Sequence, residues 1–225
     1  IERSSICSGH VNFRDQSMNQ DLALQSSANR KFATVDLSEA SDRVSLAHFQ
    51  RAFQSAPLVR GLIDASRSMR AELPNRQVVD LKKFASMGSA LCFPIEALVF
   101  FISIIASRCC RAGQFPTRQT VAKMARSVYV YGDDLIVPRD ETLAICADLE
   151  ALGFKVNSRK TFWNGKFRES CGVDAYDGTD ITPIYLRRDV PQDRGDSSGI
   201  VSTVSTANQL HEAGYYRTAT SLRRA

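Results

Sequence analysis

The hydrophobic positions of the chain form two kinds of pattern, short β-rich runs and longer runs with helical spacing. Residues 31–37 and 128–138 are rich in β-branched and aromatic side chains. We expect a strand in the first run and a hairpin in the second. Residues 92–111 are almost continuously apolar, which predicts a long buried helix with Pro94 in its first turn.

Weaker helical patterns occur elsewhere. We expect helices at residues 15–27, from Asp42 to Phe53, at residues 140–154 and near residues 206–217. The third of these has an amphipathic pattern and is ended by Gly153. Its apolar face would consist of Leu143, Ile145, Cys146, Leu149 and Leu152.

The remaining segments lack a long periodic pattern. Residues 84–90 are small and predict a loop, and residues 190–199 predict a loop or linker. Residues 155–172 predict two short strands joined by an Asn-Gly turn at Asn164 and Gly165. Residues 56–80 have no regular pattern, so we expect irregular structure there.

The order of these elements is strand, helix, loop, helix, hairpin, helix and hairpin, without regular βαβ alternation. This mixture predicts an α+β fold, with helices packed on one face of an antiparallel sheet.

Composition narrows the class of protein. The chain has 225 residues, of which 44% are hydrophobic and 24% charged, so it has enough apolar material for a core. Its net charge of +5 is compatible with a polyanionic partner. The most apolar run, residues 97–107, is about half the ~20 residues of a membrane span, so we expect a buried helix and no membrane partner. The chain does not begin with Met, and we expect it to be part of a longer polypeptide.

Cysteine and histidine give no sign of a zinc site or a disulfide framework. The six cysteines include no C-x-x-C pair, and the three histidines are scattered along the chain. We expect reduced cysteines, as in a cytosolic protein.

Two adjacent carboxylates, Asp133 and Asp134, follow Gly132 in the middle of the predicted hairpin. A turn needs only one Asp or Asn beside its glycine, so the second negative charge suggests a missing cation. Asp36 ends the strand-like run at residues 31–37 in a similar setting. If this strand pairs with the hairpin, all three carboxylates meet at one edge, where hard cations such as Mg²⁺ would bind. The alternative is an ordinary turn.

Five segments occur in an order that resembles motifs A to E of the palm of viral RNA-dependent RNA polymerases: ATVDLSEASD, FASMGSALCFPIEALVFF, VYVYGDDLIVP, GFKVNSRKTF and GKFRESCG. DQSMNQ and FRESCG are similar to segments of replicases of the single-stranded RNA phages, the leviviruses. The resemblance covers about residues 11–188. It implies a right-hand polymerase palm at residues 31–186, a fingers-side remnant at 1–30, and the start of a thumb or a linker at 187–225.

The resemblance also implies templated RNA synthesis with two Mg²⁺ ions, which Mn²⁺ could replace. Asp36, Asp133 and Asp134 match the catalytic metal ligands, and Lys160 matches a lysine that protonates the pyrophosphate leaving group. A basic residue there would also offset charge as the bond breaks. The ribose and template contacts implied are Asp42, Ser86, Gly88 and Glu96. The primer-supporting residues implied are Arg168, Glu169 and Cys171.

Two departures stand out. Cys92 occupies a place where such polymerases carry Thr, and the basic fingers motif that precedes motif A is absent. We therefore expect catalysis to need residues outside this chain.

The implied partners are template RNA, nascent RNA and nucleoside triphosphates. By resemblance they also include the host elongation factors Tu and Ts and a ribosomal protein, in the cytoplasm of an infected bacterium. Three alternatives stay open: a non-catalytic RNA-binding module derived from a palm, a reverse transcriptase, and a metal-dependent phosphatase or nuclease. Asp42 and Gly132 argue against the reverse transcriptase, and the motif B segment is unexplained by the phosphatase or nuclease.

Overall fold

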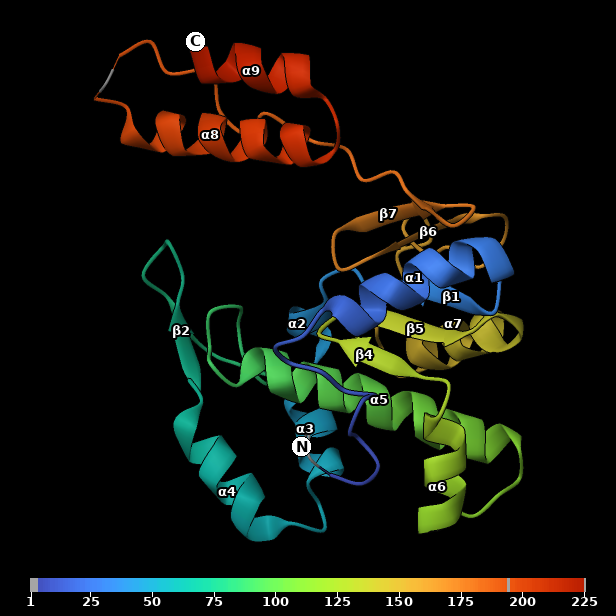
Figure 1. Cartoon of the computed structure of the whole chain (residues 1–225). Helices are drawn as coiled ribbons and strands as arrows, with labels where there is room; N and C mark the ends of the chain where they lie inside the picture. Colours follow the sequence, from blue (N-terminus) through green and yellow to red (C-terminus); the bar gives the residue numbers. More distant parts are fainter. Residues whose placement is uncertain (1–3, 194, 225) are drawn as a thin grey trace. The chain divides into compact units, whose positions relative to one another are not determined.

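The computed structural model describes residues 4–193 and 195–224, and the chain divides into two compact units between Ile181 and Thr182. At the centre of the first unit lies a three-stranded antiparallel sheet with the order β1-β5-β4 (Figure 1). Its strands are β1 (Phe32–Val35), β5 (Asp134–Pro138) and β4 (Tyr129–Tyr131). The predicted strand and the predicted hairpin therefore pair in one sheet.

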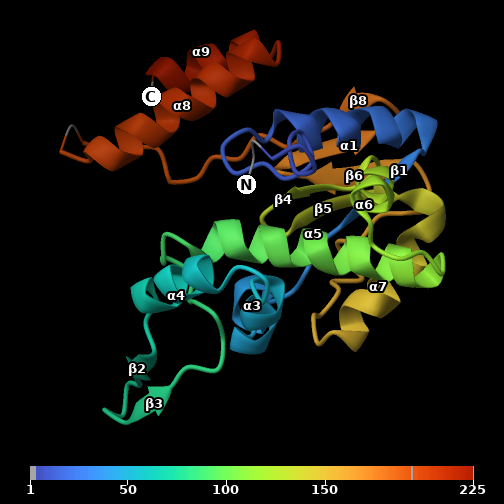
Figure 2. The ribbon, with the colours of Figure 1, turned by 90° about the horizontal axis from the view of Figure 1, so that it is seen from below.

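Helices cover both faces of this sheet. On one face lies α1 (Ser17–Asn29), and on the other lie α5 (Cys92–Arg111) and α7 (Thr142–Ala151) (Figure 2). The α+β class is confirmed, but the expectation that helices pack on one face only was wrong. The strands explain why, because neighbouring Ala33 and Thr34 are both buried, as in a strand covered on both sides.

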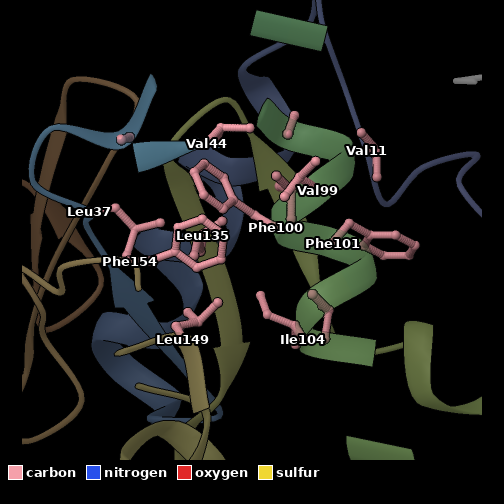
Figure 3. Packing of buried hydrophobic residues seen from close by; sticks show 14 of the residues in the cluster. Val11, Leu37, Val44, Val99, Phe100, Phe101, Ile104, Leu135, Leu149 and Phe154 are labelled. Atoms are coloured by element: carbon pink, nitrogen blue, oxygen red, sulfur yellow. The ribbon is translucent and has the colours of Figure 1, made fainter. Parts of the chain in front are cut away.

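The main hydrophobic core fills the space between the sheet and α5. Phe100 and Ile104 from α5 meet Leu135 from β5, Leu149 from α7 and Phe154 (Figure 3). The bounds of α5 agree with the predicted helix. Leu143 of α7 is 61% exposed, so the predicted apolar face of this helix was partly wrong. Which side chains of α7 are buried depends on the side of the helix that packs against α5. The spacing of apolar residues in the sequence does not specify that side.

By length and composition alone, α5 could cross a membrane, and it is the one such helix among the described residues. More than half of its apolar stretch is buried inside the fold, and core helices of soluble proteins pass the same test.

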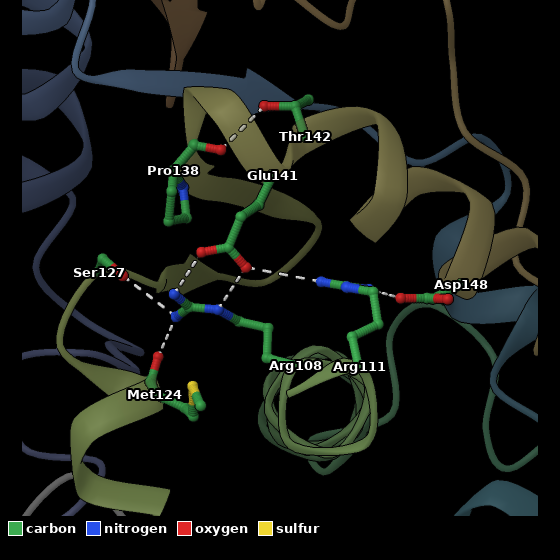
Figure 4. A network of polar contacts seen from close by, with 8 residues as sticks. All are labelled: Arg108, Arg111, Met124, Ser127, Pro138, Glu141, Thr142 and Asp148. Atoms are coloured by element: carbon green, nitrogen blue, oxygen red, sulfur yellow. Dashed lines mark hydrogen bonds and ion pairs between the residues drawn. The ribbon is translucent and has the colours of Figure 1, made fainter. Parts of the chain in front are cut away.

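A polar network fixes α5 to the segments around it (Figure 4). The guanidinium of Arg108 donates to both carboxylate oxygens of Glu141, at 2.8 and 2.6 Å, and to Ser127 Oγ at 3.1 Å. Glu141 ends η1 (Arg139–Glu141), and Arg108 also donates to the carbonyl of Met124 in α6 (Arg118–Ala125). Arg111 pairs with Glu141 and Asp148, so one side of α5 holds both α6 and α7 in place.

Two predicted segments differ from the structure before α5. The helix expected from Asp42 to Phe53 is divided into α2 (Ala40–Arg43) and α3 (Leu46–Ala52), because Ser45 begins α3 in a capping box with His48. Residues 56–80, expected to be irregular, form three further elements. They are α4 (Pro57–Ser66), β2 (Arg70–Glu72) and β3 (Val78–Asp80). These elements have no fully buried residue, although Ile63 of α4 packs against the core.

The second hairpin also lies elsewhere than expected. Residues 155–163 make only isolated bridges, and β6 (Phe167–Ser170) pairs instead with β7 (Val173–Tyr176). The turn between these strands is Cys171 and Gly172, which both have left-handed φ angles, 49° and 77°. This is the conformation that two-residue hairpins require, and Gly172 supplies its glycine. A short third strand, β8 (Thr179–Asp180), completes this sheet.

The described residues of the second unit form two helices. Asp196 caps α8 (Ser197–Glu212) by accepting a hydrogen bond from Gly199, and α9 (Tyr216–Arg224) follows a turn at Gly214. The helix expected near residues 206–217 was therefore misplaced, because Gly214 has a φ of 86° and ends the helical conformation. The predicted domain boundaries at residues 30 and 186 stay predictions.

Candidate active site

The three aspartates lie at one end of the central sheet. Val35 pairs with Leu135 as the last pair of the ladder, so Asp36 and Asp134, the next residues beyond it, lie at the same end of the sheet. Tyr131 pairs with Asp134, which leaves Gly132 and Asp133 as the turn between β4 and β5. The sheet thus gathers carboxylates from positions far apart in the sequence.

Gly132 allows this turn for two physical reasons. Its φ is 60°, in the left-handed region, and the ring of Phe93 lies where a Cβ atom would be. Phe93 belongs to the first turn of α5, so the turn bearing Asp133 rests directly on that helix.

Asp134 is held by the turn of the other hairpin. Its Oδ1 accepts a hydrogen bond from Ser170 Oγ at 3.1 Å and one from the backbone N–H of Cys171 at 3.2 Å. Burial raises the pKa of Asp134, and the hydrogen bond from Cys171 opposes that rise. One oxygen of this carboxylate is therefore engaged within the protein.

Asp36 is held by the segment that follows α7. Its Oδ2 accepts a hydrogen bond from Asn157 Nδ2 at 2.8 Å, and its carbonyl accepts one from the Asn157 backbone at 2.9 Å. Its own N–H donates to Thr161 Oγ1 at 3.4 Å. These contacts fix both the backbone and the side chain of Asp36.

Asp133 differs from its neighbour because, within the described residues, no side-chain donor pairs with its carboxylate. Burial raises its pKa, and the negative charge of Asp36 raises it further, while Lys160 opposes the shift. Glu96 of α5 is 2% exposed, and its Oε2 has no hydrogen-bond partner. Burial, followed by the charge of Asp133, raises the pKa of Glu96 to about 7. The charge of Asp36 thus disfavours ionisation of Asp133, and the charge of Asp133 disfavours ionisation of Glu96.

Lys160 lies beside this group. Its Nζ is 3.4 Å from Glu169 Oε1, and Glu169 is fixed on β6, where its N–H donates to Thr34 Oγ1 at 3.4 Å. Glu169 is the main cause that raises the pKa of Lys160, with smaller contributions from Asp36 and Asp134. Lys160 is therefore held as a cation at the same end of the sheet.

A metal ion is implied by the resemblance, and the donor chemistry can be tested. In the described part of the chain, no three His, Cys, Asp or Glu side chains form a ready-made metal site. Mg²⁺ is usually bound by one or two carboxylates together with phosphate oxygens and water. Asp36 and Asp133 supply hard oxygen donors, and Lys160 only partly offsets the charge at Asp133, so these residues fit that ion.

The structure does not bring all the predicted residues to this end of the sheet. Arg168 is buried at the opposite end of β1, where it donates to the carbonyls of Phe32 at 2.8 Å and Phe167 at 2.6 Å. Ser86 and Gly88 lie in an exposed loop before α5. Asp42 pairs with Lys83. The roles predicted for these residues stay predictions.

Cys171 contributes through its backbone. Burial raises the pKa of its thiol to about 12, with the charge of Asp134 as the next cause. A thiol with such a pKa stays protonated at neutral pH. The group of Cys171 that matters for the site is therefore its backbone N–H, which donates to Asp134.

Comparison with known proteins identifies the family. Residues 3–194 match the family model described as RNA replicase, beta-chain. This chain belongs to that family. The RNA-directed RNA polymerase subunit beta of Qbeta virus (strain MX1) is 36% identical over 79% of this chain, and that of Enterobacteria phage SP is 36% identical over 80%. The RNA-directed RNA polymerase beta chain of Escherichia phage MS2 is 34% identical over 80%. The chain spans 28%, 29% and 30% of the lengths of these three relatives.

Several residues that build the site in this replicase chain were missed by sequence reasoning. They are Asn19, Gln20, Asn157, Thr161 and Ser170. Asn19 and Gln20 lie in DQSMNQ, which carried a family resemblance but no role. Thr161 and Ser170 lie beside predicted residues, and Asn157 lies in the segment GFKVNSRKTF; only the tertiary contacts identify these three.

Proposed function

We propose that this chain forms the palm of an RNA-dependent RNA polymerase and carries the residues for templated nucleotidyl transfer. The observation that carries the proposal is the sheet register, which sets Asp36 against the turn containing Asp133 and Asp134. Membership of the RNA replicase beta-chain family supports it. The proposal concerns the whole replicase, because this chain spans only part of the length of its relatives.

In this proposal Asp36 and Asp133 hold Mg²⁺, or Mn²⁺ in its place. When bound, two such ions activate the attacking oxygen and stabilise the leaving oxygen of an in-line displacement. Asn157 orients Asp36, while Ser170 and the Cys171 backbone orient Asp134. Asp134 is proposed as a further ligand through its second oxygen, since Asp36 and Asp134 each have only one carboxylate oxygen engaged within the protein.

Lys160 is proposed to serve the leaving group. Its ammonium group interacts with the charges of Asp36 and Asp134, and its pairing with Glu169 keeps it protonated. A proton or a positive charge there would stabilise pyrophosphate as the bond breaks. Asp42, Ser86, Gly88 and Glu96 are proposed to contact the ribose and template. Arg168, Glu169 and Cys171 are proposed to support the primer end, with Arg168 acting from within the protein.

The proposal includes the partners of such an enzyme. They are template RNA, nascent RNA and ribonucleoside triphosphates, with the host elongation factors Tu and Ts and a ribosomal protein as additional subunits. The site of action would be the cytoplasm of an infected bacterium.

The test is ribonucleotide incorporation on an RNA template by the complete polypeptide that contains this segment, with the host subunits and Mg²⁺ present. Asp133→Asn should lower incorporation by about a hundredfold or more, since it removes a ligand rather than an outer contact. Asp177→Asn is the matched control, because Asp177 pairs with Lys166 on the same β6–β7 sheet without contacting the aspartates. Equal activity of the Asp133→Asn variant would refute the proposal. A preference for deoxynucleotides would favour a reverse transcriptase, and RNA binding without incorporation would favour a non-catalytic module.

A further inference from the structure

Two amide side chains of α1 contact the residues around the aspartates. Asn19 Nδ2 donates to the carbonyl oxygen of Asp134 at 3.1 Å, and Gln20 Nε2 donates to the carbonyl oxygen of Cys171 at 3.0 Å. Asn19 is 1% exposed. A buried amide is costly unless it is hydrogen-bonded, so its position in a core-facing helix calls for a specific partner.

These bonds close a ring with those already described. The Cys171 N–H donates to Asp134 Oδ1, so Asp134 is held at its carboxylate by the β6–β7 turn and at its carbonyl by α1. Gln20 holds the same turn at the carbonyl of Cys171. Three parts of the chain, α1, β5 and the β6–β7 turn, are therefore joined around Asp134.

The ring sets the position of two groups at the end of the sheet. Asp133 directly precedes Asp134, so the direction of its carboxylate depends on the backbone that Asn19 holds. Glu169 lies on β6 shortly before Cys171 and binds Lys160, so the turn that Gln20 holds also places Lys160. Neither Asn19 nor Gln20 is one of the carboxylates proposed to bind metal.

We propose that Asn19 and Gln20 are positioning residues of the polymerase site, which keep Asp133 aligned for cation binding by fixing Asp134 and the β6–β7 turn. This inference rests on the proposed function. It also gives a role to the DQSMNQ segment, whose chemistry is otherwise unexplained.

The same helix offers a matched control. Ser27 is fully buried in α1, and its Oγ accepts a hydrogen bond from the Gly178 N–H at 2.7 Å. Gly178 lies in the turn between β7 and β8, away from the aspartates. Ser27→Ala therefore removes a buried bond between the same helix and the same sheet without touching the ring.

The experiment compares Asn19→Leu, Gln20→Met and Ser27→Ala in the complete polypeptide with its host subunits. For each variant we would measure the Mg²⁺ concentration that gives half-maximal incorporation, kcat, the KM for nucleotide, and Tm. Asn19→Leu and Gln20→Met should raise the half-maximal Mg²⁺ concentration about tenfold, as loss of outer-shell partners does, and should lower kcat more than they raise KM. Ser27→Ala should lower Tm but leave the Mg²⁺ dependence unchanged.

The outcomes separate positioning from mere stability. Gln20 is only partly buried, so its variant should fold even if Asn19→Leu does not. An unchanged Mg²⁺ dependence in Gln20→Met, with a Tm shift like that of Ser27→Ala, would overturn the inference while leaving the proposed function intact. A wild-type polypeptide that incorporates no nucleotide with Mg²⁺ would overturn the proposed function and this inference with it.

Discussion

Gly132→Ala is a sharp test of how the turn bearing Asp133 is built. Two separate costs are expected from a single methyl group. The φ of 60° is unfavourable for any residue with a Cβ, by about 1–2 kcal/mol. The new Cβ would also fall well inside the contact distance of the Phe93 ring, and such overpacking costs about 1–3 kcal/mol. The free energy of unfolding should therefore fall by about 2–5 kcal/mol.

Gly113→Ala separates the two costs. Gly113 has the same φ of 60°, but nothing lies within 4 Å of the Cβ it would gain. Its substitution should cost only the backbone strain, about 1–2 kcal/mol. The excess cost at Gly132 then measures the contact with Phe93. In a Phe93→Leu background, Gly132→Ala should cost about as much as Gly113→Ala, because the ring edge is gone.

Urea unfolding followed by tryptophan fluorescence is the suitable assay. The single tryptophan, Trp163, lies in the first unit together with both glycines, so its signal reports on that unit. Equal costs for Gly132→Ala and Gly113→Ala would show that Phe93 moves aside freely, and the argument from close packing would be wrong. If Gly132→Ala still costs more than Gly113→Ala in the Phe93→Leu background, the extra cost does not come from contact with the Phe93 ring.

Three further predictions concern buried charged residues, each checked by urea unfolding. The pKa of Glu96 is raised from 4.5 to about 7 in the folded chain, so stability from its protonation is present below pH 4.5 and lost as pH rises through 7. Glu96→Gln removes this titration. Between pH 4.5 and 7, with a chelator present to remove divalent cations, its free energy of unfolding should therefore rise by about 3 kcal/mol relative to the wild type. Arg108→Met breaks the bidentate pair of Figure 4 and should cost about 3–5 kcal/mol, whereas Arg43→Met, which removes an exposed pair, should cost less than about 1 kcal/mol. Arg168→Met removes the donor of three backbone carbonyls and should cost about 2–5 kcal/mol.

The sequence predicted best where one local pattern has one structural solution. The apolar run of α5 is too long for a strand and begins with Pro94 in a tolerated position, so its limits follow from the residues themselves. The β4–β5 hairpin followed from two apolar runs around Gly132. By contrast, α4 was missed although its apolar residues have helical spacing, and it has no fully buried residue.

Choices between similar local signals could not be made from the sequence. Residues 155–172 offer Asn164-Gly165 and Cys171-Gly172 as possible turns, and the structure uses the second for its hairpin. The choice depends on β7, whose pairing with β6 is a tertiary contact. The two-sided burial of the central sheet likewise depends on α1, a helix with only a weak pattern of its own.

The candidate site illustrates the same limit at the level of single residues. Asp133 and Asp134 are identical and adjacent in the sequence, yet the structure gives them different surroundings. Ser170 and the Cys171 backbone bind Asp134, while no side-chain donor among the described residues pairs with Asp133. Burial raises the pKa of both carboxyl groups. No local pattern specifies this difference, because the partners lie 36 and 37 residues away.

The difference between the two aspartates explains why the chain tolerates adjacent like charges. Two donors within the fold bind the Asp134 carboxylate and tie two sheets together, and they oppose the rise in its pKa that burial causes. Asp133, with Asp36 and the buried Glu96 nearby, retains negative charge that Lys160 only partly offsets, since Lys160 also pairs with Glu169. A site arranged in this way is less stable alone than with a bound cation, because a cation that binds only the folded state adds to its stability. The partly offset charge of Asp133 therefore supports the proposal of a bound cation over a simple turn.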